Sequence, residues 1–196
     1  MNTQFEKVEK FMLEKLQQEL PQHLSYHSVN HVKDVMEAAM NIADAEKVDD
    51  ADKLLLRTAA LFHDSGFLFG AQEHERKSCE IARQYLPEYG FTEPQIEEIC
   101  GMIMATKIPQ DPQNHLEQIL ADADLDYLGR DDFFTIGDRL YDELAMYGIV
   151  NDKNDWNRLQ VRFLENHHYF TATAIQSRKA GKEQHLQFIK SQIGHG

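Results

Sequence analysis

Apolar residues recur at helical spacing, three or four positions apart, along almost the whole of this 196-residue chain. Within residues 4–20, for example, Phe5, Val8, Met12 and Leu16 fall on one stripe. The sequence has no convincing run in which β-branched residues alternate with polar ones, the pattern typical of strands. It therefore predicts an all-α fold, a helical bundle of roughly eight to ten helices.

Breaks in this periodicity define the expected helices, which cover residues 4–20, 28–46, 51–64, 73–85, 93–105, 115–127, 131–147, 155–165 and 171–192. Pro21 ends the first helix, and Ser28 is placed to cap the second. The stretch 66–70 contains two glycines and is expected to be a loop. Neither a low-complexity linker nor an internal repeat divides the sequence. We expect a single domain over residues 1–196, with the C-terminal helices completing the bundle.

The charge balance limits the kinds of partner. Acidic residues outnumber basic ones by 33 to 20, for a formal charge of −13, which argues against binding to nucleic acid or to an anionic membrane. A small anionic substrate remains compatible, because a bound divalent cation reverses the local potential. The N-terminal stretch is charged, and no window approaches ~18 consecutive apolar residues. We therefore expect a cytoplasmic protein; the sequence does not predict its oligomeric state.

The two cysteines, Cys79 and Cys100, stand in neither CxxC nor CxxH spacing. One disulfide between them is compatible with the sequence, but nothing in the sequence requires it. Two free thiols in a reducing cytosol are the simpler interpretation.

Three short motifs carry ionisable residues in helical surroundings: YHSVNH at 26–31, LLLRTAALFHD at 54–64 and DADLD at 122–126. Each motif also has a purely structural interpretation. The histidines of the first motif can be ordinary surface or core residues, the His-Asp pair of the second can be a chance dipeptide, and the acidic residues of the third can form a solvated helix face. Ending an apolar helix with His63-Asp64, however, costs free energy unless the pair has a partner. A metal ion is one such partner. Imidazole and carboxylate together suit a borderline divalent ion and leave coordination positions open for water or substrate.

The ordered set His31, His63-Asp64 and Asp124 resembles the H…HD…D signature of the HD-domain metal-dependent phosphohydrolases. The segments YHSVNHVKDV, LLLRTAALFHD and DADLDYLGR resemble the matching stretches of that family, over roughly residues 26–130. The family fold is all-helical, in agreement with the periodicity. The resemblance implies one divalent metal ion (Mn, Mg, Fe, Co, Ni or Zn) bound by His31, His63, Asp64 and Asp124.

Two features of the ligand set stay open at the level of sequence. Asp122 is the alternative to Asp124 as the last ligand, since both follow alanine; Asp124 aligns with several family members without a gap. Binuclear relatives carry additional histidines, and His74 stands where the first of them falls. Ala105 occupies the place of the next one, so we expect a single metal ion.

The resemblance also implies roles in catalysis and substrate binding. Asp64 is expected to bind the metal and to orient or deprotonate the attacking water, and His27 to protonate a leaving oxygen. If the helix has begun by then, His27 and His31 share one of its faces; the alternative is that His27 only supports the ligands or lies at the surface. Some members have lysine where this chain has Phe67.

Three residues are candidates for binding substrate phosphate: His74, Lys107 and Arg130. For Lys107 and Arg130, an ordinary surface charge is the alternative interpretation.

The resemblance thus predicts a hydrolase that uses a metal-activated water on a small phosphomonoester or phosphodiester, with nucleotides included by family analogy alone. The alternative is a non-catalytic HD module that binds a metal and a ligand or partner protein. Phe67 and Ala105 favour the module, because each replaces a functional residue of relatives. The complete ligand set favours the enzyme, because open metal positions serve no structural need.

Overall fold

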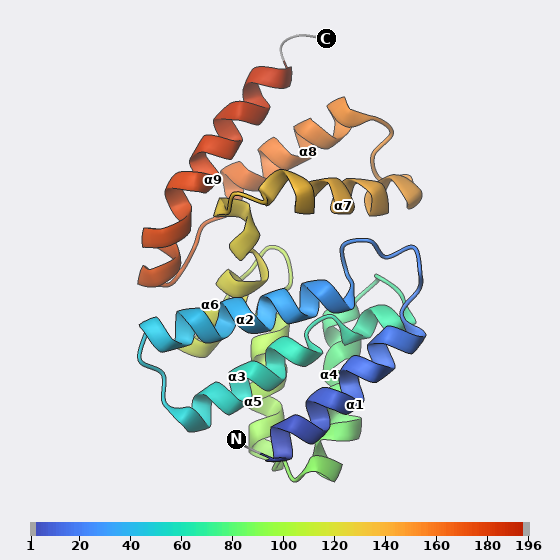
Figure 1. Cartoon of the computed structure of the whole chain (residues 1–196), viewed down its shortest axis with the longest axis vertical. Helices are drawn as coiled ribbons and strands as arrows, with labels where there is room; N and C mark the ends of the chain where they lie inside the picture. Colours follow the sequence, from blue (N-terminus) through green and yellow to red (C-terminus); the bar gives the residue numbers. More distant parts are fainter. Residues whose placement is uncertain (1–2, 194–196) are drawn as a thin grey trace. The chain divides into compact units, whose positions relative to one another are not determined.

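The computed structural model describes residues 3–193, which form two compact units (Figure 1). Of these residues, unit 1 comprises 3–21 and 27–124, and unit 2 comprises 22–26 and 125–193. The described residues contain nine α-helices, three short 3₁₀ helices and no strand. The predicted all-α class and the number of helices are therefore confirmed.

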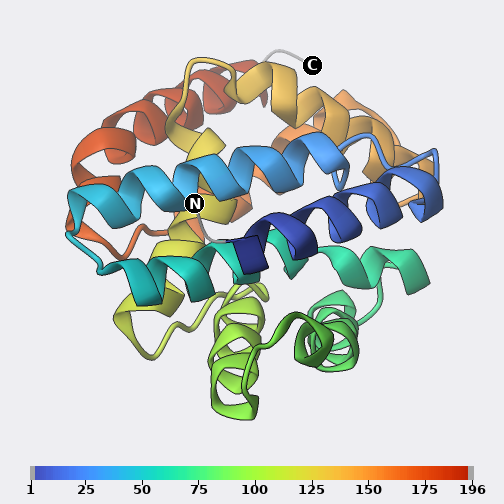
Figure 2. The same ribbon diagram turned by 60° about the horizontal axis from the view of Figure 1, so that its bottom comes forward.

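Unit 1 is built around one central apolar helix. Its elements are α1 (Thr3–Glu19), α2 (Val29–Ala45), α3 (Asp50–Phe62), η1 (Ser65–Phe69), α4 (His74–Tyr85), η2 (Leu86–Tyr89), α5 (Glu93–Ala105) and α6 (His115–Asp124). The central helix α3 contacts α1, α2, α4, α5 and α6, and Figures 1 and 2 show α2 and α3 side by side. Of its last seven residues, Leu56 to Phe62, five are apolar, and all are buried except for a partly exposed Arg57. Their burial follows from the all-round apolar character of this segment.

Local capping explains where several helices begin. The Asp49 carboxylate accepts hydrogen bonds from the amides of Ala51 and Asp52, at 3.0 and 2.9 Å, and so starts α3. At the start of α5, Thr92 and Gln95 form a capping box. Ser28 stands at the predicted N-cap position of α2, but its side chain makes no capping hydrogen bond.

The structure differs from the expected helix boundaries at each of the three motifs. Helix α2 begins at Val29, so His27 precedes the helix and does not share a helical face with His31. Helix α3 ends at Phe62 instead of continuing to residue 64, and η1 begins at Ser65. We call residues 63–66, which include the first two residues of η1, the 63–66 turn. Helix α6 ends at Asp124, three residues before the expected end. All three motifs thus lie at helix ends.

Unit 2 consists of η3 (Asp126–Gly129), α7 (Phe133–Met146), α8 (Lys153–Asn166) and α9 (Ala172–Ile193). Helix α9 packs against α8 and η3, and α7 also contacts η3. The buried core is mainly aromatic and aliphatic: Tyr26, Leu125, Tyr127, Leu128, Phe133, Leu164 and Ile189. At the contact between η3 and α9, a Cβ added to Gly181 would overlap the carbonyl group of Gly129. Glycine is required there because the two backbones approach so closely.

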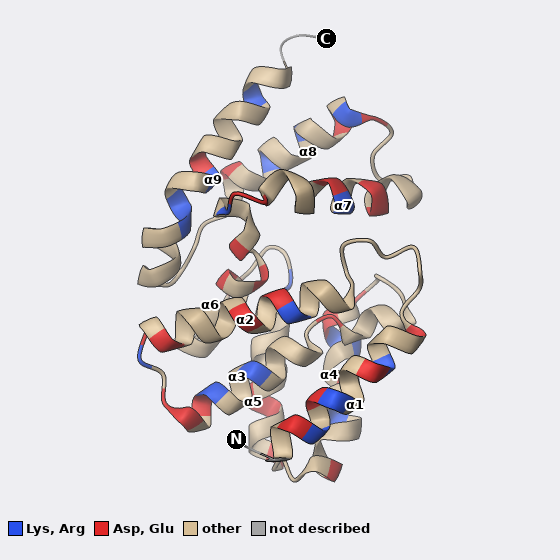
Figure 3. Cartoon of the chain, in the orientation of Figure 1, with Lys and Arg blue, Asp and Glu red and all other residues tan. Residues whose placement is uncertain are grey.

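Acidic residues occur on helices of both units and are interspersed with basic ones (Figure 3). Across residues 3–193, no helix combines the length and the apolar character that crossing a membrane demands.

Candidate metal centre

Three side chains from separate elements of unit 1 bring their ligand atoms together. His31 lies in the first turn of α2, His63 follows α3, and Asp124 ends α6. His31 Nε2 is 3.1 Å from Asp124 Oδ1 and 3.3 Å from His63 Nε2, and His63 Nε2 is 3.4 Å from Asp124 Oδ1. The structure thus brings together residues that are 93 positions apart in the sequence.

Asp64 adds a second carboxylate to this group. Its Oδ2 atom lies 3.4 Å from His31 Nε2 and 3.3 Å from His63 Nε2. The same oxygen is buried and has no hydrogen-bond partner among the described residues. A buried carboxylate oxygen without a donor is costly, so its place beside two imidazole nitrogens points to a cation as the natural partner. We call His31, His63, Asp64 and Asp124 the ligand cluster.

The donor atoms of the ligand cluster fit a divalent metal in both spacing and protonation. With metal–ligand distances of about 2.1 Å, neighbouring ligand atoms lie about 3.0 Å apart in octahedral and about 3.4 Å apart in tetrahedral coordination. The contacts to His31 and His63 fall between 3.1 and 3.4 Å. His63 Nδ1 lies 2.8 Å from the carbonyl oxygen of Ala60, to which it donates, so Nε2 is left with a lone pair for a metal.

The electrostatics of the cluster also indicate a need for positive charge. Burial lowers the pKa of His63, but the Asp64 and Asp124 carboxylates override this effect and raise it well above 6.5. Burial raises the pKa of Asp124, yet the hydrogen bonds from His31 and His63 lower it to about 2. The pKa of Asp64 is likewise lowered, chiefly by His63 against the effect of burial.

A buried serine holds the 63–66 turn in place. Ser78, on α4, donates from Oγ to the carbonyl oxygen of His63 at 2.6 Å and accepts from the amide of Gly66 at 2.8 Å. Ser78 was not predicted as a site residue from the sequence. A signal was present, because it falls on the buried stripe of α4 with Glu75, Cys79 and Ala82, where a hydroxyl needs a partner.

His27 and His74 lie next to the ligand cluster. The ring centroid of His27 is 6.2 Å from that of His31. His74 Nε2 is 3.5 Å from Asp64 Oδ1, and 3.6 Å from Oε1 of Glu75, a buried carboxylate that the sequence analysis did not single out. His74 thus faces Oδ1 of Asp64, whereas the described contacts of Asp64 with His31 and His63 are made by Oδ2.

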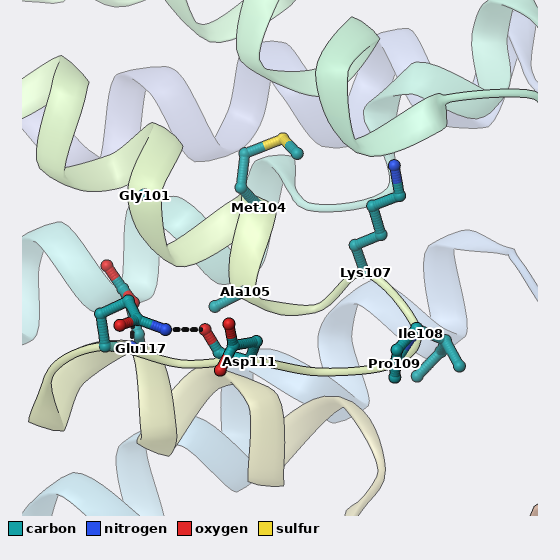
Figure 4. A pocket seen from close by; sticks show the side chains of 9 residues that line it. Gly101, Met104, Ala105, Lys107, Ile108, Pro109, Asp111 and Glu117 are labelled. Atoms are coloured by element: carbon teal, nitrogen blue, oxygen red, sulfur yellow. Dashed lines mark hydrogen bonds between the residues drawn. The ribbon is translucent and has the colours of Figure 1, made fainter.

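The other predicted residues have different surroundings. Asp122 is fully buried in α6, whereas Asp124 ends this helix with its Oδ1 beside His31 and His63. Lys107 is exposed at the edge of a pocket of about 420 Å³, and Figure 4 shows its amine directed away from Asp111 and Glu117.

Arg130 lies in unit 2. Its guanidinium pairs with Asp132 at 2.9 Å and with Asp126 at 3.5 Å. Whether Lys107 or Arg130 contacts substrate stays a prediction.

Comparison with known proteins agrees with this geometry. Residues 28–126, half of the chain, match the HD domain family. The chain belongs to the HD-domain family. The matched HD domain contains His31, His63, Asp64 and Asp124, and the resemblance inferred from the motifs is confirmed. HD domains bind divalent metals, and the superfamily consists generally of metal-dependent hydrolases.

The HD fold is also found in a solved structure, that of a predicted HD superfamily hydrolase from an uncultured Thermotogales bacterium. The similarity covers 94% of this chain and 91% of the other, with a TM-score of 0.65 and 21% sequence identity. At that identity, the likeness shows a shared fold. None of the curated proteins compared with the chain matches it.

Proposed function

We propose that this HD-domain chain is a metal-dependent phosphohydrolase that acts on a small phosphomonoester or phosphodiester, with nucleotides among the candidate substrates. The observation that carries the proposal is the ligand cluster, in which two imidazole nitrogens lie 3.3 Å apart and each of two carboxylates lies 3.1 to 3.4 Å from both of them. A mixed donor set of this kind suits a catalytic site, because it leaves coordination positions for water and substrate.

His31, His63, Asp64 and Asp124 would hold one divalent ion, of Mn, Mg, Fe, Co, Ni or Zn. When bound, such an ion supplies Lewis acidity and lowers the pKa of a coordinated water. We propose one ion and not two, because Ala105 offers no ligand atom where binuclear relatives have a histidine.

The remaining groups would handle protons and the phosphate. Asp64 uses Oδ2 within the ligand cluster, and we assign Oδ1 to orienting the attacking water and accepting its proton. His27 donates a proton to the leaving oxygen, a task for which an imidazole is suited near neutral pH. His74, Lys107 and Arg130 are the proposed phosphate-binding residues.

The alternative is a non-catalytic HD module that uses the same metal to support a binding site. Phe67 and Ala105 favour it, because they remove a phosphate contact and a second metal ligand that relatives have. Both functions require the ligand cluster, so only a measurement of substrate hydrolysis distinguishes the enzyme from the binding module.

The deciding experiment measures metal content and hydrolysis on the same preparation. The purified chain is stripped with a chelator, reloaded with each divalent ion in turn, and assayed against a panel of nucleoside mono-, di- and triphosphates and cyclic nucleotides. We expect metal-dependent release of phosphate or ring opening that the variant Asp64→Ala lacks. A chain that binds one equivalent of metal but hydrolyses none of the panel with any ion would favour the binding module.

A further inference from the structure

The phenyl ring of Phe67 contacts two imidazole rings from distant parts of the sequence. Its centroid lies 4.0 Å from that of His27, with 22° between the planes, and 4.3 Å from that of His74, with 33° between the planes. Phe67 is only 3% exposed, whereas both histidines are half-buried. One buried ring therefore supports two imidazoles that a solute can reach.

The backbone next to Phe67 fixes His74 as well. A Cβ on Gly66 would overlap the carbonyl group of His74, so the start of α4 lies directly against the 63–66 turn. The Nδ1 atom of His74 is 3.2 Å from the carbonyl oxygen of Ala71, which leaves Nε2 facing Asp64 Oδ1. Three contacts thus orient the His74 imidazole: the ring of Phe67, the Ala71 carbonyl at Nδ1 and the Asp64 carboxylate at Nε2.

His27 has no helical backbone to orient it, because α2 begins two residues later, at Val29. Its ring centroid is 6.2 Å from that of His31 and 6.2 Å from that of His74. The closest of its described ring contacts is the near-parallel stack on Phe67. The His27 imidazole thus lies nearly parallel to the buried Phe67 ring.

We infer that Phe67 is a positioning residue that holds the imidazoles of His27 and His74 beside the ligand cluster. The inference rests on the proposed function, in which His27 protonates the leaving oxygen and His74 binds the phosphate. A phenyl ring cannot bind phosphate as a lysine does, but its face stabilises an imidazolium stacked upon it. Holding both imidazoles in place before substrate arrives also lowers the entropic cost of reaching the reactive geometry.

The test compares the same substitution at two equally buried phenylalanines. Phe67→Leu removes the ring that contacts both histidines, and Phe91→Leu removes a ring that is 4% exposed and has no described contact with a histidine. Phe67→Tyr keeps an aromatic ring and is the rescue variant. Two readouts are taken on the full chain: the imidazole proton resonances of His27 and His74 without added metal, and kcat and KM for p-nitrophenyl phosphate with metal.

In the parent chain we expect nuclear Overhauser effects from the Phe67 ring to both imidazoles. Phe67→Leu should shift both histidine resonances and lower kcat by about 10- to 100-fold, with a smaller change in KM. Phe91→Leu should change neither the histidine resonances nor kcat. Phe67→Tyr should keep both close to their values in the parent. Absence of the Overhauser effects in the parent, or unchanged resonances in Phe67→Leu, would overturn the inference. If the parent chain were inactive but Phe67→Leu still shifted both histidine resonances, the result would count against the proposed function alone.

Discussion

Each oxygen of the Asp64 carboxylate faces a different set of imidazoles. Oδ2 lies beside His31 and His63, at 3.4 and 3.3 Å, while Oδ1 lies 3.5 Å from His74. This residue therefore joins the ligand cluster to the groups proposed to act on the substrate.

Asp64→Ala should abolish hydrolysis and weaken metal binding, because the cluster loses a ligand and the attacking water loses its base. Its effect on folding should be smaller, since α3 is held by apolar packing. Asp122→Ala is the matched control, because it removes a fully buried carboxylate from α6, the helix that Asp124 ends. Metal content by mass spectrometry and the hydrolytic rate are measured for both variants beside the parent.

The two variants have distinct outcomes. Asp122→Ala should keep its metal and part of its activity, whatever stability it loses. If Asp64→Ala kept both metal and activity, the assignment of the ligand cluster would fail. If Asp122→Ala lost both while Asp124→Ala kept them, the last ligand would be Asp122.

Ser78→Ala tests the support of the 63–66 turn. It deletes both hydrogen bonds of a buried hydroxyl and leaves the His63 carbonyl and the Gly66 amide without that partner. We expect a loss of about 1–3 kcal/mol in the free energy of unfolding, together with weaker metal binding. The control is Ser65→Ala, because the Ser65 hydroxyl is equally buried but has no hydrogen-bond partner within residues 3–193.

Ser65→Ala should change stability by no more than about 0.5 kcal/mol. Urea unfolding and isothermal titration with zinc measure the two effects separately. Equal losses in Ser78→Ala and Ser65→Ala would show that the bridging hydroxyl contributes nothing specific.

At the scale of elements, periodicity predicted the helices well and their ends near the site less well. The apolar stripe of α3 continues up to His63-Asp64, so the sequence offers no reason to end the helix at Phe62. The reason lies 15 residues further on, where Ser78 bonds to the His63 carbonyl. Contacts between elements of this kind do not appear in local spacing.

The same limit applies to the candidate site. The four members of the ligand cluster were predicted from their order and their resemblance to a family signature. In the structure the ligand atoms of His31, His63 and Asp124 converge, and Asp64 Oδ2 lies 3.4 and 3.3 Å from the two imidazoles. The contacts of Phe67 with His27 and His74 were not predicted, because they depend on how η1 and α4 meet. In the sequence, Phe67 was noted only because some family members have lysine at that position.

Two helical glycines of unit 2 should respond in opposite ways to alanine. In α9, Gly181→Ala would force a Cβ onto the Gly129 carbonyl, so we expect destabilisation of about 1–3 kcal/mol. In α7, a Cβ on Gly137 would meet its nearest neighbour, Gln160 Oε1, at an ordinary 3.6 Å. Gly137→Ala should therefore stabilise the chain by about 0.5–1 kcal/mol through helix propensity.

Thermal or urea unfolding of both variants measures these changes. A stabilised Gly181→Ala would contradict the close approach of α9 and η3.

At the scale of the whole molecule, metal binding should couple stability to pH. The three elements that supply the ligand cluster span residues 31–124, so a bound ion fastens α2, the 63–66 turn and α6 together. Because the ion binds the folded chain and not the unfolded one, it stabilises the fold, by about 2.7 kcal/mol at 100 times its Kd. Chelation should accordingly lower the melting temperature.

The stabilisation of the fold by the bound metal should grow as the pH rises from about 6 to about 8. Metal needs the Nε2 lone pair of His63, but Asp64 and Asp124 overcome the effect of burial and raise the pKa of this imidazole well above 6.5, so a proton competes with the ion at low pH. In the metal-free chain, the proton on His63 contributes stability that is fully present below about pH 6.5 and lost as pH rises through the raised pKa. The stability due to the lowered pKa of Asp124 is lost only as pH falls from 3.8 towards about 2, and is therefore constant in this range.

Calorimetry at the two pH values, with manganese or with EDTA, measures the difference in melting temperature directly. We expect this difference to be larger at the higher pH and to be smaller in Asp64→Ala, whose metal binding is weakened. A difference that stayed constant or narrowed as pH rose would mean that metal and proton do not compete for His63. The ligand cluster would then not be the place where the metal stabilises the chain.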